Sequence, residues 1–246
     1  MKKAIVIPAR KGSTRLKDKL LLPVNGKSVI AWTVENCLKT DIPVIVACDS
    51  QEFVEILKDY PIEIILTPSD LKSGSDRIAY AIKDKDLDYI VNVQGDEPLI
   101  EPGDIVKLFD LLKDSPVATL YYPIEKEDDY LNPNIVKVIS DKDDFAIYFS
   151  RSPIPFYRDL DFNQMLKTLT PKKHLGIYGY HKKALIDFLY NLKPAPIEEV
   201  EKLEQLRFLY NGYKIKLAKA FKDTVGIDTK EDYEKFCSLV DKEIER

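Results

Sequence analysis

The chain has 246 residues, enough for one large domain with a sizeable core, and 45% apolar with 32% charged residues is typical of a globular protein. A formal net charge of −4 argues against a nucleic-acid-binding protein, which usually carries a basic face. Three cysteines without a CxxC pair and only two histidines exclude a zinc framework and a histidine-rich metal site. No segment approaches the ~20 apolar residues of a membrane span, and the apolar run before Arg10 is too short for a signal peptide, so we expect a cytoplasmic protein.

The first half of the chain alternates strand-like and helix-like stretches. Apolar runs predict strands at 4–9, 42–49, 62–68 and 88–95, and helical periodicity predicts the helices between and after them, at 28–39, 52–60, 77–84 and 104–114. Asp49 lies three residues before Glu52, a spacing that predicts a capping box at the start of the second helix. The order predicts a mostly parallel sheet with helices on both faces, in which ligands gather at the carboxyl ends of the strands.

The second half changes character. Strand-like runs at 117–124, 135–140 and 144–151 predict a smaller mixed-sheet extension at about 120–175. The segment 174–182 alternates, which places His174, Gly176, Tyr178 and Tyr180 on one face. A helix is expected at 198–212, with Val200, Leu203 and Leu206 inward and Gly212 at its end, then a strand at 214–221 and a last helix capped by Thr229 and Asp232. We predict a single Rossmann-like α/β domain over residues 1–246.

A cation-rich loop follows the first strand. The stretch IVIPARKGSTRLKDK, residues 5–19, carries Arg10, Lys11, Arg15, Lys17 and Lys19 against one acid, Asp18. So many cations at a strand end suit a polyphosphate, with backbone N–H groups near Gly12 and Ser13 as further donors; a solvated surface turn is the alternative. GxGxxG is absent, and NGKS at 25–28 lacks the first P-loop glycine because Leu21 stands there, so this is a triphosphate loop of a third kind.

Two aspartates are candidates for a metal site. Asp96, in QGDEP, and Asp228, in GIDTKED, each follow an apolar stretch that we expect to end as a strand. Mg²⁺ prefers oxygen ligands and usually combines one or two carboxylates with substrate phosphates and water. A turn or a helix cap is the structural alternative for both, and for Asp228 in particular, because it precedes the last predicted helix.

Six segments, in order along the chain, carry a family resemblance. They are IPARKGSTRL at 7–16, VNVQGDEP at 91–98, YFSRSPIP at 148–155, HLGIYGY at 174–180, LEQLR at 203–207 and GIDTKED at 226–232. With them the chain resembles the 3-deoxy-manno-octulosonate cytidylyltransferases (CMP-Kdo synthetases), which are acidic-sugar cytidylyltransferases. The family usually has proline and glycine where Lys17 and Asp18 stand, and histidine where Leu71 stands.

The resemblance implies a Rossmann-like nucleotidyltransferase fold and a magnesium-dependent transfer of CMP from CTP to the anomeric hydroxyl of Kdo. The products would be pyrophosphate and CMP-Kdo for lipopolysaccharide biosynthesis. It also implies two Mg²⁺ ions per site, held by Asp96 and Asp228, and a homodimer formed through the extension, with neither nucleic acid nor membrane as a partner. The residues expected to carry catalysis are Asp96, Asp228, Arg10 and Lys19.

The binding residues divide into two groups. Those expected to contact the nucleotide are Pro8, Ala9, Arg10, Gly12, Ser13, Arg15, Lys19, Ser75 and Asp96. Those expected to contact the sugar are Arg77, Gln94, Arg151, His174, Tyr178, Glu204 and Gln205. Arg151 is the first candidate for the Kdo carboxylate, because a guanidinium forks onto a carboxylate, and Arg77 is the second. Glu204 and Gln205 rest on the resemblance alone, and a lone strand histidine such as His174 is more often structural.

Two other functions remain open at this point. An acylneuraminate or other acidic-sugar cytidylyltransferase would share IPAR and the acidic metal site but not LEQLR. A non-catalytic nucleotide sensor would keep the cation-rich loop but be expected to lose a metal carboxylate, and Asp96 and Asp228 are both present.

Overall fold

The computed structural model describes residues 1–12, 16–71, 73–224 and 226–244, with side chains up to residue 242. The chain divides into two compact units: unit 1 comprises Met1–Val106 and Thr224–Arg246, and unit 2 comprises Lys107–Asp223. The single domain with an extension at about 120–175 stays a prediction. In the described part of the chain, no helix combines the length and the apolar character needed to cross a bilayer.

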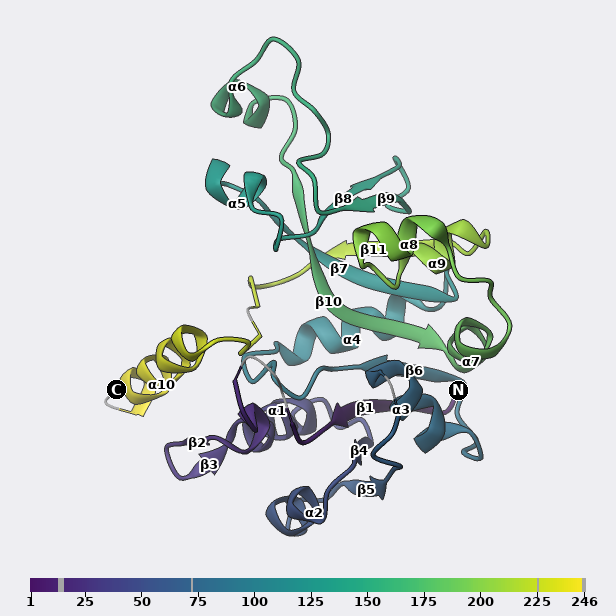
Figure 1. The fold of residues 1–246 in the computed structure, drawn as a ribbon, viewed down its shortest axis with the longest axis vertical. Coiled ribbons are helices and arrows are strands. Elements are labelled where there is room, and N and C mark those ends of the chain that lie inside the picture. The colour runs from purple at the N-terminus through teal and green to yellow at the C-terminus, as the bar shows by residue number, and fades with distance from the viewer. Residues whose placement is uncertain (13–15, 72, 225, 245–246) are drawn as a thin grey trace. The chain divides into compact units, whose positions relative to one another are not determined.

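Unit 1 is built on a parallel sheet, as the alternating pattern predicts. Its strands lie in the order β6 (Tyr89–Asn92), β1 (Lys3–Ala9), β4 (Val44–Cys48) and β5 (Glu63–Leu66). β1 pairs in parallel with both β6 and β4, and β4 pairs in parallel with β5 (Figure 1). Every residue of β4 is buried, which is why its sequence reads as a continuous apolar run rather than an alternation. The carboxyl ends of β1, β4 and β6 therefore meet at one edge.

Side-chain caps begin α1 (Val29–Leu38), α2 (Gln51–Leu57), α3 (Gly74–Ile82) and α10 (Lys230–Ile244) in unit 1. The helices that follow the four strands are α1, α2, α3 and α4 (Pro102–Leu111), whose last turn passes into unit 2. Capping boxes formed by Ser73 with Asp76 and by Thr229 with Asp232 begin α3 and α10, and the second confirms the predicted cap of the last helix. The expectation that Asp49 caps α2 is wrong. Ser50 is the cap, because its hydroxyl accepts from Glu52 N, and the carboxylate of Asp49 bonds elsewhere.

A short hairpin follows the cation-rich loop. The 3₁₀ turn η1 (Lys19–Leu21) leads into β2 (Pro23–Val24) and β3 (Lys27–Ser28), which pair antiparallel. Asn25 and Gly26, with φ of 45° and 78°, form the connecting turn and explain the NG pair of the NGKS stretch. Phe236 and Val240 of α10 pack with Val24 and Val29, so the last helix is anchored on this hairpin and on α1.

Unit 2 contains a mixed sheet, as predicted. β7 (Val117–Pro123) pairs antiparallel with β10 (Lys172–His181) and parallel with β11 (Ile215–Lys219). The hairpin of β8 (Lys137–Ser140) and β9 (Ala146–Ser150) joins β10 through β8. A β-bulge interrupts the β7–β10 register between Leu175 and Tyr178. Five helices complete the described part of unit 2: α5 (Glu127–Leu131), α6 (Phe162–Leu166), α7 (Lys182–Tyr190), α8 (Pro196–Glu201) and α9 (Leu206–Tyr210).

The single helix expected at 198–212 is wrong. The chain leaves α8 at Lys202, whose φ of 55° is left-handed, and α9 begins four residues later. Val200, expected inward, is 84% exposed, whereas Leu203 and Leu206 are buried as expected. In a continuous helix, Val200 and Leu203 would lie on the same face, because they are three residues apart. The break at Lys202 separates them, so Leu203 is buried while Val200 is exposed. Gly212 adopts a φ of 81° just after α9, which confirms it as the residue that ends the helix.

Candidate functional site

The cation-rich loop leaves the end of β1 and turns at once toward β4. Pro8 and Ala9 are buried in β1, and Arg10 follows as an exposed residue. The backbone N–H of Lys11 donates to Asp49 Oδ1 at 2.8 Å, and Lys11 Nζ donates to Glu52 Oε1 at 2.5 Å. Among the predicted nucleotide-binding residues, Ser13 and Arg15 lie outside the described residues.

Asp18 has a backbone conformation that favours glycine. Its φ of 50° lies in the left-handed region, which glycine adopts without steric cost. Asp18 Oδ1 accepts a hydrogen bond from Gly12 N at 3.3 Å, and Gly12 itself has a φ of 90°. The aspartate thus closes the loop with its own side chain, a contact that a glycine would not make.

Three of the four predicted catalytic residues meet in unit 1. Lys19 Nζ contacts Asp96 Oδ2 and lies 2.7 Å from Asp228 Oδ1, and the lysine side chain is only 15% exposed. Asp96 lies in the turn after β6. The expectation that Asp228 follows a strand is wrong: β11 ends at Lys219, and Asp228 comes just before α10. A hydrogen bond of 2.8 Å from Ile227 N to Asp96 O holds the two aspartate segments together.

The two carboxylates determine the charge of the lysine between them. Burial lowers the pKa of the Lys19 ammonium, but attraction to Asp96 and hydrogen bonds to Asp228 and Asp96 outweigh burial, so the pKa lies above its ordinary value. Lys19 is therefore a cation at physiological pH. Its ammonium lies between the carboxylates of Asp96 and Asp228 and contacts both of them.

The donor set around this place fits magnesium. Both ligands are carboxylates, and a cation already bridges them. In the described part of the chain, no three His, Cys, Asp or Glu side chains form a more complete metal site. Mg²⁺ commonly uses only one or two carboxylates and completes its coordination with phosphate oxygens and water, so two aspartates are sufficient.

Close backbone packing surrounds this place. A Cβ at Gly74, at the start of α3, would lie 3.4 Å from the Pro8 side chain, so the helix end that carries Ser75 abuts β1. A Cβ at Gly95 would lie 3.2 Å from Leu20 and 3.3 Å from Pro8 O, tighter than most contacts of real Cβ atoms. The turn that carries Gln94 and Asp96 therefore favours glycine between them.

Two polar residues of α1, which sequence reasoning missed, hold the same turn. Thr33 Oγ1 donates to Gly95 O at 3.0 Å, and Asn36 Nδ2 donates to Pro98 O at 2.6 Å. Their signal in the sequence is weak: both are polar residues within a mostly apolar helix. Gln94 makes a long contact of 3.4 Å from Nε2 to Asn92 Oδ1.

Arg77 is placed differently from the sequence expectation. Its guanidinium is 3% exposed and pairs with Asp49, with Arg77 Nη2 3.2 Å from Asp49 Oδ2. Arg77 Nη1 also contacts Thr67 Oγ1 and lies 3.3 Å from Pro68 O. The second candidate for the sugar carboxylate thus already holds a carboxylate within unit 1.

The other predicted sugar-binding residues lie in unit 2. The His174 ring contacts the rings of Phe149 and Tyr178, with centroids 5.0 and 5.4 Å away, so the shared face of His174 and Tyr178 survives the bulge between them. Burial lowers the pKa of His174 to about 3, and its Nε2 lies 3.2 Å from Thr119 Oγ1. His174 is therefore neutral at physiological pH.

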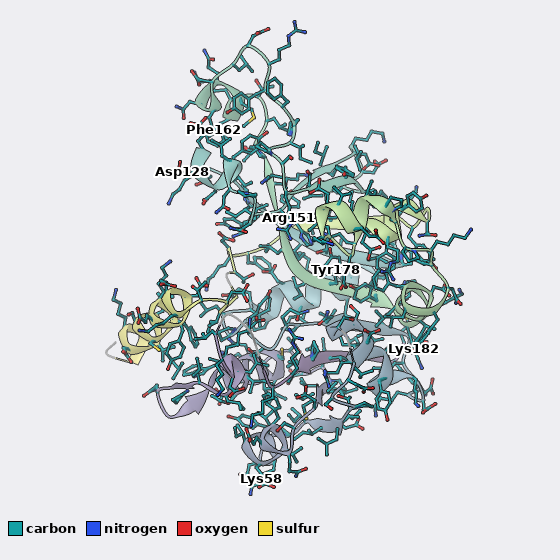
Figure 2. All side chains as sticks on the ribbon, in the orientation of Figure 1. Lys58, Asp128, Arg151, Phe162, Tyr178 and Lys182 are labelled. Carbon is teal, nitrogen blue, oxygen red and sulfur yellow. The ribbon has the colours of Figure 1, made fainter. Side chains whose placement is uncertain are left out.

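Tyr178 lies beside His174 on β10 and is labelled in Figure 2. Burial raises its pKa well above the ordinary value. Its hydroxyl is buried and, among the described residues, makes no hydrogen bond of ordinary length, although Thr119 lies close enough to weaken the effect of burial. A buried hydroxyl without such a bond is costly unless a ligand or water completes it.

Arg151, also labelled in Figure 2, joins the end of β9 to the break between α8 and α9. Its guanidinium donates to Glu201 O at 2.8 Å from Nε, to Pro133 O at 3.1 Å from Nη1, and to Lys202 O at 3.5 Å from Nη2. Its backbone N–H donates to Glu201 Oε2 at 2.9 Å. Arg151 thereby anchors the segment that continues to the exposed Glu204 and the buried Gln205.

Two residues that sequence reasoning missed support Arg151. The Glu201 carboxylate accepts from Ser150 Oγ at 2.6 Å as well as from Arg151 N. Lys137 is fully buried and donates to Asn132 O, Ile135 O and Arg151 O, at 3.0, 2.6 and 2.6 Å. Desolvation lowers the pKa of Lys137, against the attraction of Glu201. A lysine in a strand gives no sequence signal that it will be buried.

Comparisons with known proteins identify the family. A family model described as cytidylyltransferase matches residues 4–215. A 3-deoxy-manno-octulosonate cytidylyltransferase of Chloroherpeton thalassium is 41% identical, covering 99% of this chain and 100% of its own length. The protein of that name from Christiangramia forsetii is 42% identical, covering 96% of this chain and 95% of its own length.

Solved structures extend the comparison to the fold. A structure of CMP:2-keto-3-deoxy-manno-octonic acid synthetase complexed with CTP has a TM-score of 0.91 and 35% identity, covering 99% of this chain and 100% of that one. A 4-diphosphocytidyl-2C-methyl-D-erythritol synthase from Anaerococcus prevotii, at 14% identity with a TM-score of 0.65 over 98% of each chain, shares the fold alone. The predicted Rossmann-like nucleotidyltransferase fold is thus confirmed. On this evidence the chain belongs to the cytidylyltransferase family, among the 3-deoxy-manno-octulosonate cytidylyltransferases.

Proposed function

We propose that this chain transfers CMP from CTP to the anomeric hydroxyl of Kdo and releases pyrophosphate, giving CMP-Kdo for lipopolysaccharide biosynthesis in the cytoplasm. The observation that carries the proposal is the contact of Lys19 with both Asp96 and Asp228, in a chain similar over its whole length to enzymes named for this reaction. A nucleotide sensor without catalytic activity would not need to keep Lys19, Asp96 and Asp228 in contact.

The reaction forms one bond and breaks one. The anomeric oxygen of Kdo bonds to the α-phosphorus of CTP, the bond from that phosphorus to the β-phosphate oxygen breaks, and the hydroxyl proton is released. CTP and the sugar carboxylate are both anionic, so catalysis depends on placing positive charge and on orientation. We assign Arg10, Lys19 and Arg15 to the phosphates, with backbone donors near Gly12 and Ser13.

Asp96 and Asp228 are proposed to hold Mg²⁺, with two ions per site. When bound, magnesium polarises the phosphate oxygens and lowers the pKa of the attacking hydroxyl. The Lys19 ammonium would attract the phosphate oxygens, because an opposite unit charge about 4 Å away is worth ~4 kcal/mol at an effective dielectric constant near 20. Pro8, Ala9 and Ser75 are assigned to the cytosine base, which the abutment of α3 on β1 favours.

The residues proposed for the sugar are those that the family resemblance implies. The Gln94 side chain offers both a hydrogen-bond donor and an acceptor to sugar hydroxyls. The Arg151 guanidinium has more N–H groups than its contacts with main-chain carbonyls use, and we assign the others to the Kdo carboxylate. His174 is neutral, so it acts by hydrogen bonding and not as a counter-ion. The buried hydroxyl of Tyr178 needs a partner that a sugar hydroxyl would supply. Glu204 and Gln205 complete the proposed set.

We propose a homodimer that forms through the extension. Residues around α5 and α6, whose Asp128 and Phe162 Figure 2 labels, leave large apolar side chains exposed. These are Leu131, Phe156, Leu160 and Leu169. Sedimentation equilibrium tests this directly: the native chain should sediment as a dimer and Phe156→Asp should shift it toward monomer, whereas a monomeric native chain would refute the dimer.

Pyrophosphate release tests the function. The purified chain is incubated with CTP, Mg²⁺ and, separately, Kdo, N-acetylneuraminate and other acidic sugars. Turnover with Kdo alone supports the proposal, and turnover with another acidic sugar in its place would reassign the substrate. If no sugar supports turnover although CTP binds, the chain is a nucleotide sensor.

A further inference from the structure

We propose that Asp49 and Arg77 are positioning residues that set the start of the cation-rich loop for the triphosphate of CTP, an inference that rests on the proposed function. Neither residue needs to touch the nucleotide. The argument comes from the hydrogen bonds that converge on the Asp49 carboxylate from two directions.

The first direction is the loop itself. Asp49 directly follows β4, and its Oδ1 accepts the backbone N–H of Lys11 at 2.8 Å. This bond fixes the plane of the peptide that joins Arg10 to Lys11, and with it the direction in which the chain leaves β1. Because Arg10 is assigned to the triphosphate, its side chain starts from a backbone that Asp49 holds in place.

The second direction is helix α3. Arg77 Nη2 lies 3.2 Å from Asp49 Oδ2, and the two side chains are only 3% and 8% exposed. Thr67, the residue after β5, accepts from Arg77 Nη1, and its hydroxyl donates to Cys48 O of β4 at 2.9 Å, so the guanidinium is oriented by groups next to both strands. Asp49 therefore cannot turn away from the loop without leaving a buried arginine unpaired.

The ion pair links the two ends of the proposed nucleotide site. Arg77 and Ser75 lie on the same helix, α3, and Ser75 is assigned to the cytosine base. Arg77 in turn orients the carboxylate that holds the phosphate loop. A buried ion pair is weak evidence for stability, because desolvation offsets its attraction, so a positioning role explains its presence better than stabilisation does.

A matched pair of double variants tests this role. Both carry Arg77→Met, which removes the buried cation, and they differ only at position 49: Asp49→Asn keeps an oxygen acceptor for the Lys11 N–H, and Asp49→Leu, of similar size, removes it. We expect the Leu double variant to raise the KM for CTP between about tenfold and 100-fold. The Asn double variant keeps the acceptor but loses the arginine that orients it, so its KM for CTP should rise by a smaller factor than that of the Leu double variant. In both variants the KM for Kdo at saturating CTP should change less than the KM for CTP.

Two controls separate positioning from folding. Glu63→Gln breaks an exposed ion pair with Lys85 elsewhere in unit 1 and should leave the KM for CTP unchanged. Unfolding temperatures identify any loss of stability, and assays are run well below them. Equal KM values for CTP in the Asn and Leu double variants, whether native or raised, would overturn the proposal.

Two further measurements keep the test decisive. Hydrogen exchange at the Lys11 amide does not depend on turnover. It should be faster in the Leu double variant than in the Asn double variant, and equal rates would count against the proposal even if the chain proves to be a sensor.

If a double variant fails to fold, Thr67→Val removes one contact of Arg77 while keeping both charges. It should raise the KM for CTP by a smaller factor, and an unchanged KM would overturn the proposal.

Discussion

Lys19 and Asp228, 209 residues apart in the sequence, are joined by a hydrogen bond of 2.7 Å, and the same ammonium contacts Asp96. A cation that bridges two carboxylates has two consequences. It shields them from mutual repulsion when no other cation is present, and it competes for them with a metal ion. Both consequences can be measured.

Replacing Lys19 should separate phosphate binding from metal binding. Lys19→Met removes the ammonium, so we expect kcat to fall by about 100-fold, because the positive charge at the phosphates is lost. We also expect Mn²⁺ to bind the nucleotide-free variant about tenfold more tightly, since no ammonium competes for Asp96 and Asp228. Calorimetry with Mn²⁺ checks the second effect, and weaker Mn²⁺ binding would show that Lys19 does not share the carboxylates with the metal.

The two aspartates should act together on the metal requirement. Asp96→Asn and Asp228→Asn each keep size and one oxygen but lose the charge, so we expect kcat to fall by about 100-fold and the Mg²⁺ needed for half-maximal rate to rise. Asp110→Asn, at an exposed ion pair with Lys113, is the matched control and should behave as native. A pyrophosphate assay titrated with Mg²⁺ distinguishes the variants, and an unchanged Mg²⁺ requirement in both would remove them as metal ligands.

The contacts of Arg151 predict that it affects the sugar and not the nucleotide. Arg151→Ala removes both the proposed carboxylate donor and the anchor of the Glu201–Lys202 carbonyls, so the KM for Kdo should rise about 100-fold and the KM for CTP far less. Glu201→Gln keeps Arg151 but loses the charge of the carboxylate that holds its backbone N–H. We expect it to raise the KM for Kdo by a smaller factor, and equal effects on both substrates would contradict the sugar assignment.

Burial of neutral His174 predicts a loss of stability in acid. Its pKa in the folded state is about 3, against about 6.5 when unfolded, so the unfolded state binds the proton more readily. His174 therefore does not change the free energy of unfolding above about pH 7. Below about pH 6.5 the free energy of unfolding falls by up to about 1.4 kcal/mol for each pH unit, until His174 also becomes protonated in the folded protein near pH 3.

Urea unfolding near pH 7 and near pH 5 measures this dependence. His174→Gln keeps a hydrogen-bonding side chain opposite Thr119 but has no titrating group, so between these pH values it should lose about 2 kcal/mol less than the native chain does. The same pH dependence in both proteins would show that the ring of His174 reaches water in the folded state.

Much of unit 1 follows from the sequence because its signals are local. The strands β1 and β4 are almost entirely buried, so each can be identified from its own apolar run without knowledge of its neighbours. The two residues of each capping box, Ser73 with Asp76 and Thr229 with Asp232, lie three residues apart. The family resemblance likewise depends only on six short motifs and on their order along the chain. The strand positions of unit 1, the cap of α10 and the enzyme family were therefore within reach of the sequence, whereas the cap of α2 was not.

The tertiary structure alone decided which distant groups meet. The pairing of Arg77 with Asp49, the approach of Asp228 to Asp96 without a preceding strand, and the use of Arg151 as an anchor for the break at Lys202 each join segments far apart in the chain. Periodicity and capping report on neighbours within a few residues, whereas a buried ion pair forms where packing excludes water and leaves each charge one partner. The sequence names these charged residues, but only the packing of the chain selects their partners.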